Sequence, residues 1–150
     1  VAGGKDGWFT NEWADSLNYV NVSRDTDTSH TPVTFEQVLT WDPQVLLVTG
    51  KGMSNMTANS VLTNSVEGVD LSTLSSVKSG RVYSTGLGMW NWFTPNPDAP
   101  IVANWIGASL YPDQFSDVDL VTITKDYYQK MYNFTLTDEQ ARRIVNPDAS

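Results

Sequence analysis

Several common functional groups are missing or scarce in this sequence of 150 residues. It has no cysteine, which excludes disulfides, thiolate metal sites, Cys-x-x-Cys redox chemistry and a cysteine nucleophile. Its one histidine, His30, lies in a polar stretch without paired cysteines or suitably spaced acids, so it is a weak metal ligand or general base. The most apolar run, residues 45–48, has the size of a strand and is far shorter than the roughly 20 residues of a membrane span.

The sequence also has no cluster of lysine or arginine, and its formal net charge is -8. Such an acidic surface repels polyanions, so no nucleic-acid partner is expected. With 40% hydrophobic and 17% charged residues, the chain has the composition of an ordinary globular protein. Its length predicts a single domain over residues 1–150.

The usual enzyme motifs are incomplete or absent. No Gly-x-Ser-x-Gly element occurs, and Gly50-Lys51-Gly52 lacks the upstream glycine and the following Ser or Thr of a phosphate-binding loop. Gly86-Leu87-Gly88 lacks the third glycine of a dinucleotide fingerprint, so a turn explains it better. Asp113, Asp117 and Asp119 lack the glycine and glutamate of a calcium-binding loop. The sequence therefore predicts neither catalytic residues nor a metal site.

Short apolar runs alternate with helical patterns along the chain. Thr34 and Thr137 each precede a helical pattern and have a glutamine three residues later, the spacing of a capping box. Phe35, Val38 and Leu39 are expected to form the buried side of the first of these helices. The expected helices cover about 34–41, 55–64, 98–110, 124–132 and 137 onward, and the expected strands cover 44–49 and 81–84, after a strand that ends in residues 1–5. This order predicts an α/β fold, a three-layer sandwich whose mostly parallel central sheet has helices on both faces.

Large side chains gather in the segments that follow the predicted strands. Open parallel sheets bind ligands outside the carboxyl ends of their strands, and aromatic rings in loops offer their area to a ligand. The alternative is that these rings cover the end of the sheet or fill an interface. The candidate ligand-binding residues are Trp8, Trp13, Lys51, Met53, Met89, Trp90 and Trp92. Trp41 and Trp105 fall on predicted helices and are expected in the core.

Four passages together resemble a known family. They are residues 34–48 (Glu-Gln-hydrophobic, then Asp-Pro), 74–83 (ending Val-Lys-Ser-Gly-Arg-Val-Tyr), 88–92 (glycine with tryptophans) and 105–120 (containing Tyr-Pro-Asp-Gln-Phe). In this order they look like the carboxy-terminal lobe of the helical-backbone, or class III, periplasmic binding proteins that carry iron siderophores, haem or cobalamin to ABC importers.

The resemblance implies a monomeric, extracytoplasmic binding protein, periplasmic or lipid-anchored at the cell surface, with an ABC permease as its partner. It implies that this chain is one lobe of a two-lobed protein, without the amino-terminal lobe and the connecting helix. The implied ligand is a metal chelate, held without a covalent cofactor. Asp98 matches the acidic residue with which such lobes dock on the permease, although capping of the helix that follows is an equally good interpretation.

Two other functions use the same residues. Exposed tryptophans also stack on sugars, so a carbohydrate-binding module is an alternative, although such modules are usually β-sandwiches. A further alternative is an α/β enzyme without its partner domain, in which Lys51 or Asp98 acts as a base.

Overall fold

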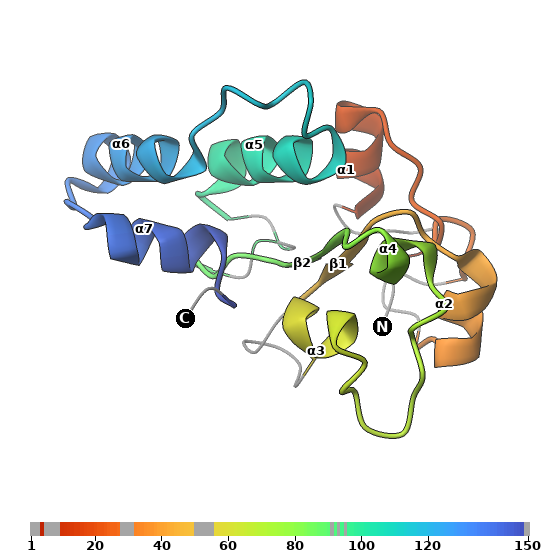
Figure 1. Ribbon diagram of the computed structural model, residues 1–150. Coiled ribbons are helices and arrows are strands. Elements are labelled where there is room, and N and C mark those ends of the chain that lie inside the picture. Colours follow the sequence, from red (N-terminus) through yellow and green to blue (C-terminus); the bar gives the residue numbers. More distant parts are fainter. Residues whose placement is uncertain are drawn as a thin grey trace. The chain divides into compact units, whose positions relative to one another are not determined.

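The computed structural model describes residues 4, 10–27, 32–49, 56–90, 92, 94 and 96–148, and Figure 1 shows the course of the chain. Within these residues helices separate and flank two short strands, both of which the sequence predicts, whereas the helix Thr10–Leu17 lies where a loop was expected. In chain order the elements are α1 (Thr10–Leu17), α2 (Phe35–Trp41), β1 (Leu46–Val48), α3 (Ala58–Leu62), α4 (Ser75–Lys78), β2 (Val82–Ser84), α5 (Ala99–Leu110), α6 (Leu120–Tyr132) and α7 (Asp138–Val145).

Strands β1 and β2 form a parallel pair. The N–H of Leu46 donates to the carbonyl of Arg81 at 3.0 Å, and the N–H of Thr85 donates to the carbonyl of Val48 at 2.8 Å. One bond is donated by β1 and the other by the residue that follows β2, and the paired positions advance together along both strands. This is the pattern of a parallel ladder. The predicted α/β class with a parallel sheet is confirmed. The strand expected in residues 1–5 lies outside the described residues, apart from Gly4.

The chain divides into two compact units. The first unit consists of Val1–Leu46 and Ser60–Val82, and the second of Leu47–Asn59 and Tyr83–Ser150.

In the first unit, α2 has a cap at each end. The Thr34 hydroxyl accepts the N–H of Gln37 at 3.2 Å, as the sequence predicts, and Asp42 ends the helix in the left-handed conformation, with φ of 41°. The expected burial of Phe35 is wrong, because its ring is exposed, while Val38 and Leu39 are half-buried. The apolar core of this unit lies elsewhere and includes Ala14, Val61, Leu71, Leu74 and Val82.

In the second unit, α6 packs against both α5 and α7 (Figure 1). Trp105 of α5 is buried, as predicted, and its indole N–H donates to the carbonyl of Val145 at 2.9 Å. Gly107 allows α5 to meet the ring of Phe115, because a Cβ at this position would lie 2.3 Å from that ring. These contacts hold one core together, which includes Trp92, Ile101, Val102, Trp105, Ile106, Tyr128, Leu136, Ala141 and Val145.

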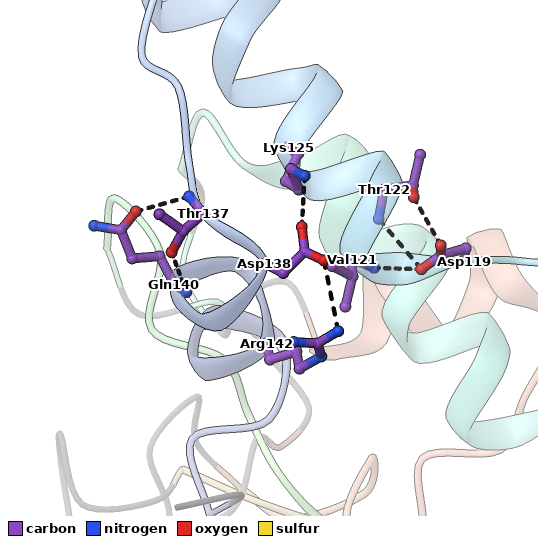
Figure 2. A network of polar contacts seen from close by, with 8 residues as sticks. All are labelled: Asp119, Val121, Thr122, Lys125, Thr137, Asp138, Gln140 and Arg142. Atoms are coloured by element: carbon purple, nitrogen blue, oxygen red, sulfur yellow. Dashed lines mark hydrogen bonds and ion pairs between the residues drawn. The ribbon is translucent and has the colours of Figure 1, made fainter.

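Both α6 and α7 begin at side-chain caps, which Figure 2 shows. The Asp119 carboxylate accepts the N–H groups of Val121 and Thr122, at 3.0 and 3.2 Å, so α6 begins four residues before the predicted start at 124. Thr137 and Gln140 form the predicted capping box at the start of α7.

An ion-pair network joins the two capped helices on their outer side (Figure 2). Asp138 of α7 lies 2.5 Å from the amine of Lys125 on α6 and 3.6 Å from the guanidinium of Arg142. The Lys125 contact lowers the pKa of Asp138 below its ordinary value of 3.8. Because all three side chains are exposed to solvent, which screens their charges, each pair contributes little to stability.

Candidate functional site

The segment that follows β2, residues 85–90, carries the candidate site and is called the β2 loop below. It leaves the carboxyl end of a parallel strand, where ligands bind to open α/β sheets. Met89 and Trp90 are 55% and 66% exposed, and Leu87 is exposed as well. Three neighbouring large apolar side chains on the surface are unusual and indicate a contact surface. Met89 and Trp90 are therefore accessible to solvent at the carboxyl end of β2.

Beneath the β2 loop, a buried carboxylate gathers four hydrogen-bond donors. Oδ2 of Asp98 accepts the backbone N–H of Met89 at 2.8 Å, the indole N–H of Trp92 at 3.2 Å and the hydroxyl of Tyr128 at 3.2 Å. Oδ1 accepts the hydroxyl of Tyr132 at 2.9 Å. The Asp98 side chain is 0% exposed. A buried carboxylate needs such partners, because an unpaired charge in the interior is strongly destabilising.

The expectations for Asp98 and Trp92 need correction. Asp98 is fully buried and its oxygens are engaged, so it offers no surface on which a permease arginine could dock, and no access for a substrate to a base. Its side chain does not cap α5 either. Trp92 is 1% exposed and meets the ring of Trp105 edge to face, with centroids 5.9 Å apart, so it belongs to the core and not to a ligand surface.

Two glycines of the β2 loop are required by close packing. A Cβ on Gly88 would lie 1.9 Å from Oδ2 of Asp98, and a Cβ on Gly86 would lie 2.3 Å from the carbonyl oxygen of Ile144. Both distances are far inside van der Waals contact. The Gly86-Leu87-Gly88 sequence thus brings the loop backbone onto the buried carboxylate and the end of α7, which is more than the turn expected from the sequence.

The tyrosines beside Asp98 have altered acidity. Burial, followed by the charge of Asp98, raises the pKa of Tyr128 well above its ordinary value of 10.0. Burial, followed by the hydrogen bond to Asp98, raises the pKa of Tyr132 in the same direction. The two rings also meet edge to face, with centroids 5.0 Å apart. Both phenols remain protonated and donate to Asp98 under ordinary conditions.

The other candidate residues are not part of this cluster. Trp13 lies half-buried on α1 in the first unit, and not in a loop as expected. Arg24, a possible partner for ligand carboxylates, pairs with Asp15. The remaining predicted residues, Trp8, Lys51 and Met53, lie outside the described residues, as does His30.

Sequence reasoning missed Tyr128 and Tyr132, and it assigned Gly88 to a turn without its contact to Asp98. The two tyrosines are four residues apart, which places them on one face of a helix, and this spacing was the available signal. It does not reveal that the face covers a carboxylate, because Asp98 lies 30 residues before Tyr128 in sequence.

The part of the chain that the structure describes contains no group of His, Cys, Asp or Glu residues able to hold a metal ion. Among the same residues, no helix has the length and apolarity needed to cross a bilayer. Ligands bind to open α/β sheets outside the carboxyl ends of their strands, and the exposed, apolar β2 loop lies at such an end.

Known solute-binding proteins match this chain. It is 28% identical over 138 residues to the molybdate-binding protein MolA of Haemophilus influenzae. The aligned residues make up 91% of this chain and 38% of MolA. The crystal structure of a periplasmic solute-binding protein from Veillonella parvula matches with a TM-score of 0.82 at 27% identity, over 95% of the chain and 45% of that protein. The structure of MolA bound to molybdate matches with a TM-score of 0.67 at 26% identity, over 90% of the chain and 40% of MolA.

The chain is thus similar in sequence and in fold to periplasmic solute-binding proteins, and it spans less than half the length of these relatives. No protein-family model matches it. The relatives are binding proteins and not enzymes, in agreement with the expected absence of catalysis, and their periplasmic location agrees with the expected extracytoplasmic location.

Proposed function

We propose that this chain is part of the solute-binding component of an ABC importer and that its β2 loop contacts a metal chelate, such as a ferric siderophore, haem or cobalamin. The observation that carries the proposal is the exposure of Met89 and Trp90 at the carboxyl end of β2. A chelate has a large, partly apolar surface, and burying an aromatic and a thioether side chain against it is favourable. The proposed partner is the membrane permease of the importer, since MolA is described as the binding protein of an ABC transporter.

A second candidate ligand is molybdate or a similar oxyanion, which the name of MolA favours. An oxyanion is small and needs several N–H donors. In the β2 loop the N–H of Met89 is already given to Asp98, whose carboxylate would repel a nearby anion. The apolar β2 loop therefore favours the chelate over the oxyanion. The α/β fold argues against a carbohydrate-binding module.

The test is a titration of the intact protein with ferric siderophores, haem, cobalamin, molybdate and, as an anion control, sulfate. Calorimetry measures the affinity for each, and tryptophan fluorescence reports contact with the ring of Trp90. The chelate proposal expects saturable binding of at least one chelate together with quenching. If molybdate alone binds, the ligand is the oxyanion and the chelate proposal is wrong. If no compound binds, the proposed binding function is refuted.

Trp90→Ala identifies the surface that is used. The side chain is largely exposed, so its removal leaves the core intact, while the loss of its contact area lowers chelate affinity roughly ten-fold or more. Phe134→Ala is the matched control, because Phe134 is also an exposed aromatic residue, 52% exposed, and lies beyond the end of α6. Equal affinities in the two variants would show that the β2 loop is not the contact surface.

A further inference from the structure

The two carboxylate oxygens of Asp98 have different partners. Oδ2 accepts the backbone N–H of Met89 and the indole N–H of Trp92, both from the segment after β2, together with the hydroxyl of Tyr128 on α6. Oδ1 accepts the hydroxyl of Tyr132, which is also on α6. We propose that Asp98 is a positioning residue that fixes the backbone of the β2 loop so that Met89 and Trp90 are presented to a ligand. This role rests on the binding function proposed above, and it differs from the docking role expected from the sequence.

The bond to Met89 acts on the part of the loop that carries the exposed side chains. Its N–H belongs to the planar peptide unit between Gly88 and Met89, so a 2.8 Å bond to a carboxylate fixes the orientation of that whole unit. Hydrogen bonds to an ionised acceptor are stronger than those between neutral groups. Fixing this unit fixes the Cα of Met89, from which its side chain starts and the backbone continues to Trp90.

Gly88 makes the arrangement possible. A Cβ at this position would lie 1.9 Å from Oδ2 of Asp98 and 2.8 Å from the hydroxyl of Tyr128, so any other residue would push the loop off the carboxylate. The backbone of the loop and the carboxylate are therefore adapted to each other.

Burial makes the position of the loop hard to change. Asp98 is 0% exposed, so a movement that withdrew the N–H of Met89 would remove the shortest of the hydrogen bonds to its carboxylate at a position that solvent does not reach. Such a loss is costly because the desolvation of the charge is then offset less fully. A loop held in one conformation before binding loses less entropy when a ligand arrives, which increases affinity.

The competing explanation is that Asp98 only holds α5 and α6 together. Asp98→Asn distinguishes the two, since a carboxamide has one acceptor oxygen and places an NH2 group among the donors. Ile106→Val is the matched control: Ile106 is buried in α5, and its shortening weakens the same core without removing a hydrogen bond.

The first measurement is amide hydrogen exchange resolved by NMR, without ligand. In Asp98→Asn the amide of Met89 is expected to exchange roughly ten-fold faster or more, since its acceptor loses its charge and one of its two oxygens. The amides in the middle of α6 and α7 are expected to change less. In Ile106→Val any change should be shared by all of these amides. If exchange in Asp98→Asn accelerates equally at all of these amides, with Met89 no faster relative to wild type than the amides of α6, the proposal is overturned.

Tyr132→Phe separates the two oxygens, since it removes only the partner of Oδ1. It is expected to accelerate exchange of the Met89 amide less than Asp98→Asn does. An equal or larger effect would show that the bond between α6 and Asp98, and not the bond to Met89, holds the loop. If Asp98→Asn does not fold, the wild-type protein still decides, because rapid exchange of the Met89 amide in the native state would overturn the proposal.

The second measurement is affinity for whichever compound of the panel binds. Asp98→Asn is expected to bind it roughly ten-fold more weakly at a temperature where the variant is fully folded, whereas Ile106→Val binds it as the wild type does. Unchanged affinity in Asp98→Asn would overturn the presenting role. If the wild type binds no compound of the panel, the proposed function fails, and the exchange experiment still reports on Asp98.

Discussion

The carboxylate of Asp42, which ends α2, accepts both the backbone N–H and the hydroxyl of Ser75, each at 2.7 Å. Ser75 is the first residue of α4, and Leu74 before it has no side chain that could cap the helix. A residue 33 positions earlier in the chain thus caps the start of α4. The same two hydrogen bonds link the end of α2 to the start of α4.

This contact predicts acid-dependent stability. The backbone hydrogen bond from Ser75, followed by its hydroxyl, lowers the pKa of Asp42 below the ordinary value of 3.8. The stabilisation is therefore present above about pH 4 and is lost as the pH falls through the lower, folded value. Asp42→Ala should reduce the melting temperature at neutral pH but hardly at pH values where Asp42 is protonated in both states.

Asp42→Asn is the control for this prediction, because Asn tolerates the left-handed backbone and keeps one acceptor oxygen. Thermal unfolding followed by circular dichroism should rank the variants wild type, Asn, Ala at neutral pH. The same difference between wild type and Ala in strong acid would contradict the assignment.

The capping box of α7 provides a second prediction. Thr137→Ala removes the oxygen that accepts the N–H of Gln140 and should lower the free energy of unfolding by about 1 kcal/mol. Thr137→Ser keeps the hydroxyl and should cost much less. Denaturant titration of the two variants measures the difference; equal losses would show that the methyl group of Thr137, and not its cap, stabilises the helix.

The elements that sequence reasoning predicted well depend on local signals. The starts of α2 and α7 follow from a threonine with a glutamine three residues later, and strand β1 follows from a β-branched, apolar run between a proline and a glycine. Each of these signals involves residues that are close in the chain. The predicted start of α6 is four residues late, because its capping residue, Asp119, has no glutamine or glutamate three residues later.

The candidate site was predicted only in part, because exposure is decided by contacts between distant residues. Met89 and Trp90 are exposed, as expected, but Trp92, two residues further on, is buried against Trp105 and donates to Asp98. Nothing in a run of Met, Trp, Asn and Trp tells which ring turns inward. The burial of Asp98 depends on tyrosines that come 30 and 34 residues later.

The close approach of Gly88 to Asp98 predicts a strict requirement for glycine. Gly88→Ala would place a methyl group on Oδ2 and should lower the free energy of unfolding by about 1–3 kcal/mol or more. Gly80 is the informative contrast, since its φ is 69° and no atom lies near its Cβ position. Gly80→Asn should be tolerated because Asn adopts the left-handed region, whereas Gly88→Asn should be as harmful as Ala. Denaturant titrations that rank the two Asn variants equally would contradict this.

The tyrosines around Asp98 predict a loss of stability in alkali. Because the folded state raises the pKa of Tyr132 above 10.0, the folded state retains a proton that the unfolded state releases. Its contribution is thus complete below about pH 10 and falls as the pH rises further. Tyr132→Phe should be less stable than the wild type at neutral pH and should lose stability less steeply above pH 10. Parallel curves of unfolding free energy against pH would show that Tyr132 does not titrate in this way.

The role of the β2 loop predicts different effects for two equally accessible methionines. Met89 is 55% exposed in the loop and Met131 is 62% exposed on α6, so truncating either to alanine leaves the core unchanged and should alter the unfolding free energy by less than about 0.5 kcal/mol. If the loop contacts a chelate, Met89→Ala loses thioether contact with it, and the affinity should fall several-fold, about 1 kcal/mol. Met131→Ala should bind as the wild type does. Calorimetric titration of both variants provides the comparison, and a weaker complex for Met131→Ala than for Met89→Ala would move the ligand surface from the β2 loop to α6.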